Sequence, residues 1–419
     1  MLNLVTSTPS DHQDFTRTLD EIAREGARRM LQEALEAEVC DYLARHATLR
    51  DDHGRALVVR NGKARTRSVT LSSGTIEVAA PRLNDRRPGA KFTSRILPPY
   101  LRKSPKVESL LPLLYLKGLS SSDFKSALES FLGEGTSGLS SASIVSLKRS
   151  WEAEFDKWKK KPITKRFAYI WADGIHVSIR LGEDRRLCLL VLIGVTENGE
   201  KELLSVSSGY RESEDSWREA LQDLVARGLK TPLLAIGDGA LGFWSALRSA
   251  QGFERTQEQR CWVHKIANVL DKLPKRLQPR AKSMLHEMMR AEKKSDAEIA
   301  KKKFTAEFHE RYPNAVKKVE KDWDELTTFF SFPAIHWQHI RTTNAIESTF
   351  ATVRLRTNVT KGAGSKKAAE AMTFKLLQEA EKRWKRIRGY EQLGALMNGV
   401  AVVDGNVLRA PNHSVGDAA

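Results

Sequence analysis

The stretch FAYIWADGIHVSI, residues 167–179, begins the part of the chain that decides the fold. It is rich in β-branched and aromatic residues, and two more apolar runs follow it, RLCLLVLIGVTENGE at 186–200 and KELLSVSSGY at 201–210. Runs of this composition, bounded by turn residues, predict β-strands. Residues 213–229 then place apolar side chains at helical spacing, and TPLLAIGD at 231–238 returns to strand chemistry. The sequence therefore predicts three consecutive strands, a helix and a fourth strand.

This order of elements fits the start of an α/β domain with a ribonuclease H-like core. Between about residues 264 and 330 the chain is rich in Lys and Glu and poor in Gly, which predicts an α-helical insertion. The C-terminal region is thereby divided into the first part of the core at 161–260, the insertion at 261–335, the last part of the core with C-terminal helices at 336–400, and a loosely ordered tail at 401–419.

The charge of the chain points to a polyanionic partner. The 69 Lys and Arg residues exceed the 52 Asp and Glu residues, which gives a net charge of +17 and a pI near 9.7. Nucleic acid is the expected partner, and a merely basic protein is the alternative. Eight basic residues are candidates for DNA contact: Arg65, Arg67, Arg82, Lys148, Arg149, Arg354, Arg356 and Lys361.

The first 160 residues predict a helical region with a small β-hairpin. Apolar residues at helical spacing predict a helix from Asp14 to about Arg45, and region 1–50 could dimerise through it. In region 51–100, alternating apolar residues on both sides of a Ser-Ser-Gly turn predict a hairpin. The basic, Pro/Gly-punctuated segment at 81–92 predicts a loop, which either lies along phosphates or is simply solvated.

Region 101–160 returns to helical patterns. Two short helices joined by a Gly-containing turn, the second carrying Lys148 and Arg149, are typical of a helix-turn-helix that binds DNA ends. Most helix pairs are only packing units, so this alternative stays open.

The cysteine count and the hydropathy favour a cytoplasmic protein. Cys40, Cys188 and Cys261 are too few and too far apart for a disulfide framework or a four-thiolate zinc site, which is typical of a reducing compartment. We see no signal peptide, and no apolar stretch approaches the ~20 residues that span a bilayer. We expect no membrane partner.

Three acidic residues carry the chemistry. Asp173 lies in an Asp-Gly pair, usually a turn, but apolar residues flank it on both sides, so its carboxylate is expected at or inside the sheet. Asp238 follows an apolar run and precedes a helix start, where it is either a metal ligand or a helix cap. Its neighbours Gly237 and Gly239 favour close backbone approach and hence function. Glu347 lies on a predicted helix, where a lone Glu usually faces solvent.

Two other residues favour a functional role for Glu347. Arg354 is two helical turns after it and could hold a phosphate, and Asn344 lies three residues before it on the same face. Three converging carboxylates repel one another unless cations neutralise them, and oxygen ligands favour Mg²⁺. Two such ions can activate a water or a 3′-hydroxyl for phosphoryl transfer. Cys261 and His264 alone are half a zinc site; a role in supporting the acidic cluster or orienting DNA is the stronger reading, and a core Cys beside a surface His is the alternative.

Several motifs, in this order, closely resemble bacterial Mutator-type (MULE-related) insertion-sequence transposases. They are LSSGTIEVAAPRL, YLKGLSSSDFKSALESFLG, WADGIHVSIR, LLAIGDGALGFWSAL, QRCWVHKIANVLDKLP and IRTTNAIESTFATVRLRT, and the resemblance covers most of residues 15–400. It implies a DDE transposase whose metal-binding triad is Asp173, Asp238 and Glu347. It also implies the family's paired motif at Cys261 and His264 and its basic residue at Arg354.

The resemblance also implies a mechanism and partners. The enzyme would bind terminal inverted repeats in double-stranded DNA, cleave a strand with two Mg²⁺ ions (Mn²⁺ substituting), and transfer the 3′-hydroxyl to target DNA. It implies a homodimer in the synaptic complex, a bacterial cytoplasmic protein associated with the nucleoid when bound, and a replicative route through circular DNA. A DNA-binding protein without catalysis, and a nuclease or resolvase of the same fold without transposition, are the competing hypotheses.

Overall fold

The computed structural model describes residues 18–117, 119, 123–132, 141–179, 186–209, 212–239, 241–359 and 362–408. The chain divides into two compact units, 1–147 and 148–419. Their boundary falls inside helix α4 (Ser141–Lys159), whereas the sequence predicts that the core starts at 161. Lys367 reaches Asp156 on α4 at 2.9 Å, and the Trp158 ring packs 4.7 Å from that of Phe374, so the second half of α4 belongs to the C-terminal unit.

The N-terminal unit packs one helix on a hairpin. Helix α1 (Leu19–Arg45) begins at a capping box in which the Thr18 and Glu21 side chains bond to each other's backbone N–H; the predicted start at Asp14 lies outside the described residues. Strands β2 (Arg67–Leu71) and β3 (Gly74–Val78) form the predicted hairpin. Its apolar face buries Val69, Ile76 and Val78 against Leu35 of α1. Helices α2 (Pro105–Leu116) and α3 (Asp123–Leu132) complete the described unit.

The predicted basic loop at 81–92 begins as a strand. Strand β4 (Pro81–Asp85) pairs antiparallel with β1 (Val58–Lys63). The prediction was wrong here because Pro81 sits at the first position of the strand, where its missing N–H costs no ladder bond. The helix-turn-helix stays a prediction, because the connection at 133–140 lies outside the described residues.

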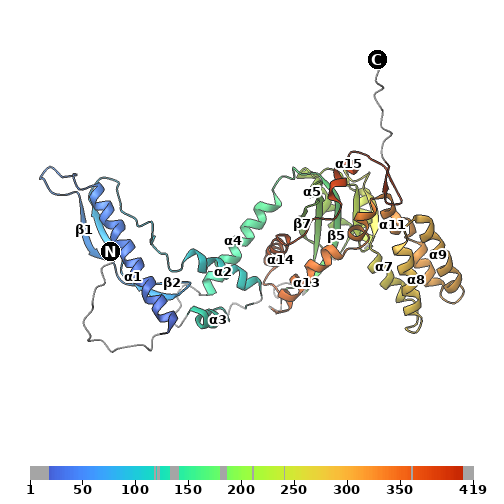
Figure 1. Cartoon of the computed structure of the whole chain (residues 1–419), viewed down its shortest axis with the longest axis horizontal. Helices are drawn as coiled ribbons and strands as arrows, with labels where there is room; N and C mark the ends of the chain where they lie inside the picture. Colours follow the sequence, from blue (N-terminus) through green and yellow to red (C-terminus); the bar gives the residue numbers. More distant parts are fainter. Residues whose placement is uncertain are drawn as a thin grey trace, which may run out of the picture. The chain divides into compact units, whose positions relative to one another are not determined.

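The C-terminal unit is built on a mixed five-stranded sheet (Figure 1). The predicted order of three strands, a helix and a fourth strand is confirmed. The elements are β5 (Phe167–Ser178), β6 (Arg186–Thr196), β7 (Lys201–Gly209), α5 (Glu214–Ala226), β8 (Leu234–Gly237), α6 (Leu241–Ser249) and β9 (Gln257–Arg260). In the sheet the order is β7-β6-β5-β8-β9, with β7, β6 and β5 antiparallel and β8 and β9 parallel to β5.

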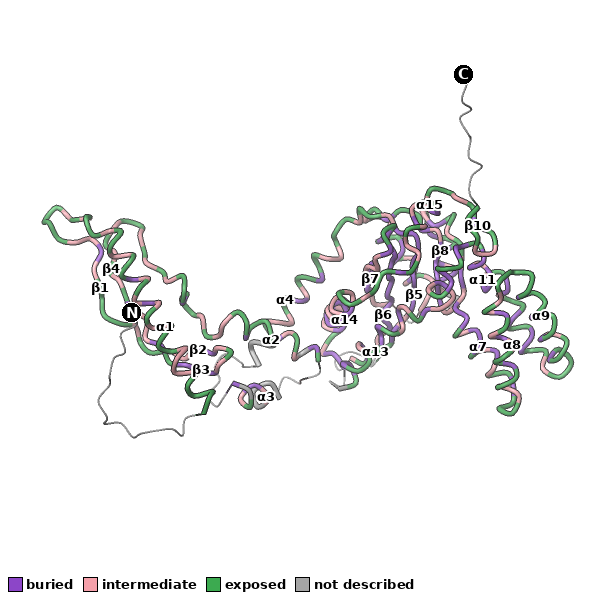
Figure 2. The backbone as a smooth tube through the Cα atoms, viewed as in Figure 1, coloured by how far each residue is buried: buried purple, intermediate pink, exposed green. Residues whose placement is uncertain are grey.

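Helices cover both faces of this sheet. On one face, Ile170, Ala172 and Leu190 pack against Trp217 of α5 and Phe243 of α6. The other face is covered by α13 (Asn344–Val359) and α14 (Lys366–Glu381), which contact β5 and β7. The central strands are buried over most of their length, except at the end of β5 and the start of β6, where His176, Ser178 and Arg186 are exposed (Figure 2). Side chains that alternate along β5 therefore point to two different helical layers.

The segment predicted to be a helical insertion is helical, and it follows β9 directly. Its helices are α7 (Trp262–Leu270), α8 (Gln278–Arg290), α9 (Lys294–Phe308), α10 (Pro313–Glu320) and α11 (Trp323–Thr327), followed by the 3₁₀ turns η1 (Thr328–Ser331) and η2 (Ala334–His336) and the short α12 (Trp337–Ile340). The buried Gln259 of β9 joins the insertion to the sheet, since its amide accepts from Phe329 N and donates to Leu326 O.

The start of the predicted tail is ordered. After η3 (Tyr390–Gln392) and α15 (Leu393–Met397), strands β10 (Val402–Val403) and β11 (Asn406–Val407) form a small hairpin. Gly405 at its turn exchanges backbone hydrogen bonds with Phe330 and Ala334. The prediction of a loose tail from 401 was therefore wrong for these residues, because the hairpin is short and carries little apolar signal. None of the described helices has the length and apolar composition needed to cross a membrane.

Candidate active site

Asp173 lies on β5, and Asp238 directly follows the adjacent parallel strand β8. Strand β5 runs through Asp173 and Gly174 without a turn, and the carboxylate is inside the sheet as expected, 8% exposed. Ala172 pairs with Gly237 of β8, so the next residue of each segment is an aspartate. Because Ala172 packs under α5 and α6, alternation directs Asp173 to the opposite face, toward α13.

Asp173 has a raised pKa, and burial is its main cause. Burial raises the pKa of this carboxyl to about 7, and repulsion from Asp238, Glu212 and Glu347 adds to the effect, while the Gly174 N–H opposes it from 2.8 Å. Four carboxylates from four separate segments of the chain therefore act on one region of the sheet edge.

The glycine beside Asp238 admits an arginine. Gly239 has φ +94°, and a Cβ there would lie 2.0 Å from Cζ of Arg260. The guanidinium thus occupies the space of a missing side chain, and its Nη1 pairs with Asp322 of the insertion at 2.9 Å.

Glu347 is held by a network around Thr343. The Thr343 hydroxyl hydrogen-bonds to the Glu347 carboxylate, and His264 Nδ1 lies 3.4 Å from that hydroxyl and 3.7 Å from Glu347 Oε1. The backbone N–H of Thr343 donates to Cys261 Sγ at 3.3 Å. The ligand atoms of Cys261, His264 and Glu347 all lie within 4.8 Å of one another. The Cys–His pair therefore adjoins one of the three predicted acids.

The same network sets the charges of the pair. The hydrogen bond of His264 to Cys261 and the attraction between them raise the pKa of His264 to about 9, and attraction to Glu347 and Asp238 adds to this rise. Burial opposes ionisation of Cys261, but hydrogen bonds with His264 and Thr343 outweigh it and lower the pKa of the thiol. Both directions favour a thiolate beside an imidazolium.

The remaining predicted residues of α13 divide by exposure. Asn344 and Arg354 are exposed, and the Arg354 guanidinium lies 5.9 Å from the Phe350 ring centre. Arg356 is 1% exposed, so in this conformation it does not face a DNA ligand. Arg356 is two residues after Arg354 on α13, and residues two apart along a helix are rotated by about 200° from each other. The two arginine side chains therefore point in different directions. Lys361 lies outside the described residues.

The basic residues of the N-terminal unit and α4 also differ. Arg65, Arg82 and Arg149 are exposed, and Lys148 is half-buried. Arg67 donates to the carbonyls of Leu97 and Pro98 at 3.2 and 2.9 Å, so it holds the chain after the hairpin.

Three residues near the acids were not predicted from the sequence. Thr343 and Arg260 act through contacts far apart in the chain, and Glu212 lies in an acidic run that reads as a solvated helix start. A Thr directly before a helix is a capping signal that could have singled out Thr343. Glu212 lies over Gly174, where a Cβ would be 2.4 Å from its Oε1.

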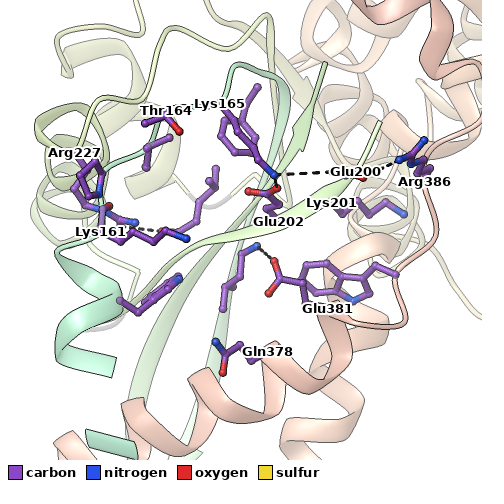
Figure 3. Close-up of a pocket in the computed structure, with 17 residues that line it drawn as sticks. Lys161, Thr164, Lys165, Glu200, Lys201, Glu202, Arg227, Gln378, Glu381 and Arg386 are labelled. Atoms are coloured by element: carbon purple, nitrogen blue, oxygen red, sulfur yellow. Dashed lines mark hydrogen bonds and ion pairs between the residues drawn. The ribbon is translucent and has the colours of Figure 1, made fainter. Parts of the chain in front are cut away.

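Two cavities lie in the C-terminal unit. One of about 900 Å³ begins beside Glu212 and is lined by Trp244, Arg260 and Asp322 among others. Another, of about 570 Å³, is lined by residues of β7 and α14, and in Figure 3 its charged side chains face one another across it. Lys165 pairs there with Glu202. The second cavity contains none of the predicted site residues, and its ion pairs indicate a packing role.

Comparison with known proteins gives a consistent family. A family model described as "Transposase, Mutator family" matches residues 3–387. The transposase for insertion sequence element IS6120 of Mycolicibacterium smegmatis is 48% identical over 306 residues, which are 73% of this chain and 94% of that protein. The transposase for IST2 of Acidithiobacillus ferrooxidans is 50% identical over 280 residues, 67% of this chain and 94% of that protein. The transposase for IS256 in transposon Tn4001 of Staphylococcus aureus is 23% identical over 327 residues, 76% of this chain and 80% of that protein.

Proposed function

The chain belongs to the Mutator family of transposases, and from this premise we propose that it is a DDE-type enzyme that moves an insertion sequence. It would bind the terminal inverted repeats, cleave DNA at the element's ends and join the 3′-hydroxyls to target DNA in the bacterial cytoplasm. The observation that supports this most is the adjacency of Asp173 and Asp238 across β5 and β8, with Glu347 on the helix that covers that face.

The topology supports a ribonuclease H-like core. Three antiparallel strands followed by two strands parallel to the first, with helices on both faces, are what such a core requires. The acids then fall at the end of β8 and beside it on β5. Crevices at the carboxyl ends of parallel strands are common ligand sites in α/β sheets.

The residues fit divalent cations. Asp173 and Asp238 offer oxygen donors, and burial disfavours charge on Asp173 unless a cation compensates it. Two Mg²⁺ ions, or Mn²⁺ in their place, would polarise the scissile phosphate and lower the pKa of the attacking hydroxyl. Asp173 and Asp238 would hold these ions from the sheet and Glu347 from α13. Thr343 and His264 would fix the orientation of the Glu347 carboxylate.

DNA binding would use exposed cations of both units. Arg65 and Arg82 beside the N-terminal hairpin and Arg149 on α4 are solvent-accessible donors for phosphate. Arg354 on α13 would hold a phosphate near Glu347. Two element ends must be brought together, so we also propose a homodimer. Ile22 and Met30 on α1 are 56% and 66% exposed and offer it an apolar contact.

Purified protein tests the proposal on a duplex that carries a terminal inverted repeat next to flanking DNA. With Mg²⁺ or Mn²⁺ we expect cleaved 3′-hydroxyl ends and joined products, and with EDTA neither. Asp173→Asn, Asp238→Asn and Glu347→Gln should each lower cleavage by at least about 10³-fold and leave end binding nearly unchanged. Strand joining by any of these variants would refute the triad, and cleavage without joined products would point to a nuclease instead.

A further inference from the structure

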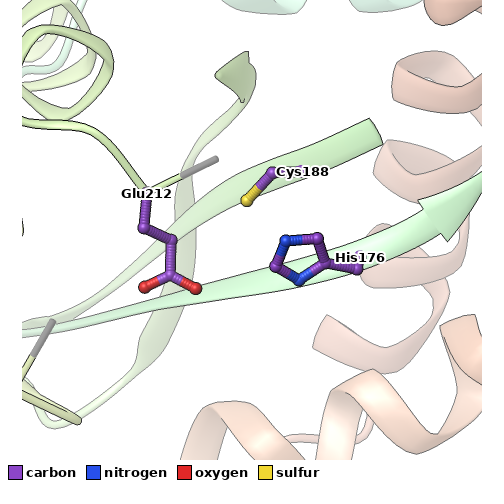
Figure 4. A group of neighbouring side chains, drawn as sticks. All are labelled: His176, Cys188 and Glu212. Carbon is purple, nitrogen blue, oxygen red and sulfur yellow. The ribbon is translucent and has the colours of Figure 1, made fainter. Parts of the chain in front are cut away.

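A second group of side chains converges on the other face of the sheet. His176 on β5, Cys188 on β6 and Glu212 before α5 place an imidazole nitrogen, a sulfur and a carboxylate oxygen within 4.8 Å of one another. Figure 4 shows the Glu212 carboxylate, the thiol and the ring facing a common space. Three different donor types thus meet at one point.

The fold builds this group from local rules. His176 and Cys188 are directly paired across the antiparallel β5–β6 ladder, so their side chains rise from the same face. That face is the one under α5 and α6, because Cys188 continues the row of Leu190 and Leu192 in the core. Asp173 is three residues before His176 on β5, so its side chain points to the opposite face of the sheet. The group therefore lies on the other face of the sheet from Asp173, although Glu212 still acts electrostatically on Asp173 and Asp238.

Glu212 reaches the group because a glycine of β5 leaves room for its carboxylate above the sheet. Gly174 lies two residues before His176 on the same face of β5, and a Cβ there would lie 2.4 Å from Glu212 Oε1. Gly242 of α6 gives a second gap, since its Cβ would lie 2.1 Å from the carbonyl oxygen of Glu212. Two missing side chains therefore allow this carboxylate to lie against the sheet beside the thiol.

Among the residues that the structure describes, no neighbour satisfies the three donors. Within the described part of the chain, none of the three side chains forms a hydrogen bond or an ion pair. A half-buried carboxylate and a buried thiol without partners are costly, and polar groups of this kind are normally paired. The arrangement thus leaves lone pairs of three kinds directed at one space.

We propose that His176, Cys188 and Glu212 bind a thiophilic divalent metal ion, Zn²⁺ above all, at a site distinct from the magnesium site. Thiolate, imidazole and carboxylate together are a zinc-type set, whereas Mg²⁺ takes oxygen ligands. Ligand atoms on a tetrahedral Zn²⁺ lie about 3.5 Å apart, which small side-chain rotations would reach from the present spacing. His176 is exposed, so the fourth position is open to water.

Binding has two local consequences. Burial raises the pKa of the Cys188 thiol to about 12, so the entering metal must displace the thiol proton to the solvent. The metal would also fix Glu212. The next residue, Ser213, caps the N-terminus of α5 with its side chain. Because Asp238 and Asp173 act electrostatically on this region, the bound cation would offset their repulsion of Glu212.

Co²⁺ is the probe that tests this site, because a Co²⁺–thiolate bond gives a near-ultraviolet charge-transfer band and zinc is silent. Metal-free full-length protein is titrated with Co²⁺ without DNA, and Zn²⁺ is then added in competition. We expect one equivalent of Co²⁺ to give the band and Zn²⁺ to remove it. Cys188→Ser should abolish the band, and His176→Gln should weaken Co²⁺ binding at least about 10-fold.

Matched controls come from the other two cysteines. Cys40→Ser and Cys261→Ser should keep the band, although Cys261 belongs to the group with His264 and Glu347. His176 is on the surface, so its replacement tests the site even if Cys188→Ser fails to fold. No band, a band indifferent to His176→Gln, or a band lost only in Cys261→Ser would each overturn the proposal. All these readouts are independent of DNA cleavage, so they stand or fall apart from the proposed function.

Discussion

At the scale of single residues, Thr343 links the Cys–His pair to an acid of the site. Its hydroxyl contacts Glu347 and approaches His264, while its N–H contacts Cys261. Thr343→Val keeps the shape and the N–H but loses the hydroxyl. We expect about 10- to 100-fold slower DNA cleavage with unchanged end binding, because partners that orient a metal ligand carry effects of this size. Thr343→Ser, which restores the hydroxyl, should recover most of the rate. Cleavage by Thr343→Val at the native rate would show that the hydroxyl has no positioning role.

Asp173 makes a prediction about stability and metal. Its carboxylate is buried and repelled by Asp238, so without a divalent cation its charge opposes folding. In EDTA at pH 8, Asp173→Asn should raise the free energy of unfolding by about 1–3 kcal/mol. Mg²⁺ should stabilise the native protein and leave the variant nearly unchanged. Urea unfolding of both proteins with and without Mg²⁺ measures this, and an equal Mg²⁺ effect on the two would argue against a metal ligand at 173.

At the scale of elements, a buried histidine joins the sheet to the segment before η3. The Tyr169 hydroxyl of β5 donates to His336 Nδ1 at 2.7 Å, and His336 Nε2 donates to Gly389 O at 2.8 Å. The Gly389 carbonyl can only accept, so it places the proton on Nε2, and burial lowers the pKa of His336 and so favours the neutral ring. The folded pKa is below the unfolded one, so the stabilisation is present above about pH 6.5 and is lost as the pH falls through the folded pKa.

Urea unfolding at pH 7.5 and 5.5 tests this coupling. The native protein should lose stability toward pH 5.5, with a slope of up to about 1.4 kcal/mol per pH unit for this one proton. His336→Gln should be less stable at pH 7.5 but show a smaller slope. His339, whose pKa burial lowers to about 4, leaves part of the acid sensitivity in the variant. An identical slope in both proteins would remove His336 from the explanation.

The elements also show what the sequence could predict. Strands β5 to β8 have long apolar runs, and the hairpin of β2 and β3 has clean alternation, so both followed from periodicity. Strand β9 did not, because QEQR is polar and its buried residue, Gln259, is held by hydrogen bonds to the insertion. Asp173 lies inside β5 and Asp238 directly after β8, so their adjacency also depends on the pairing of Ala172 with Gly237, which no local pattern gives. The contacts of Thr343 and Glu212 could not be predicted from the sequence. They depend on the tertiary fold, because no local pattern brings these two residues to the acids.

At the scale of the whole molecule, the positive charge makes a prediction about DNA affinity. Each phosphate contact releases counterions, so the logarithm of affinity should fall steeply with the logarithm of salt concentration. Arg65→Ala and Arg82→Ala should each reduce this slope by about 1 for end-containing duplex. Lys302→Ala, an exposed change on the insertion helix α9, is the control and should leave the slope unchanged. Fluorescence anisotropy at several salt concentrations gives the slopes, and unaltered slopes in both arginine variants would move the DNA contact elsewhere.

The pairing of Gly239 with Arg260 has an evolutionary consequence. Any side chain at 239 would have to enter the space of the guanidinium and adopt a left-handed backbone. A larger residue there would strain the backbone and push the end of the arginine side chain away from Asp322. In copies of the element that lose Gly239, the contact between Arg260 and Asp322 should no longer be kept, and these residues should drift together.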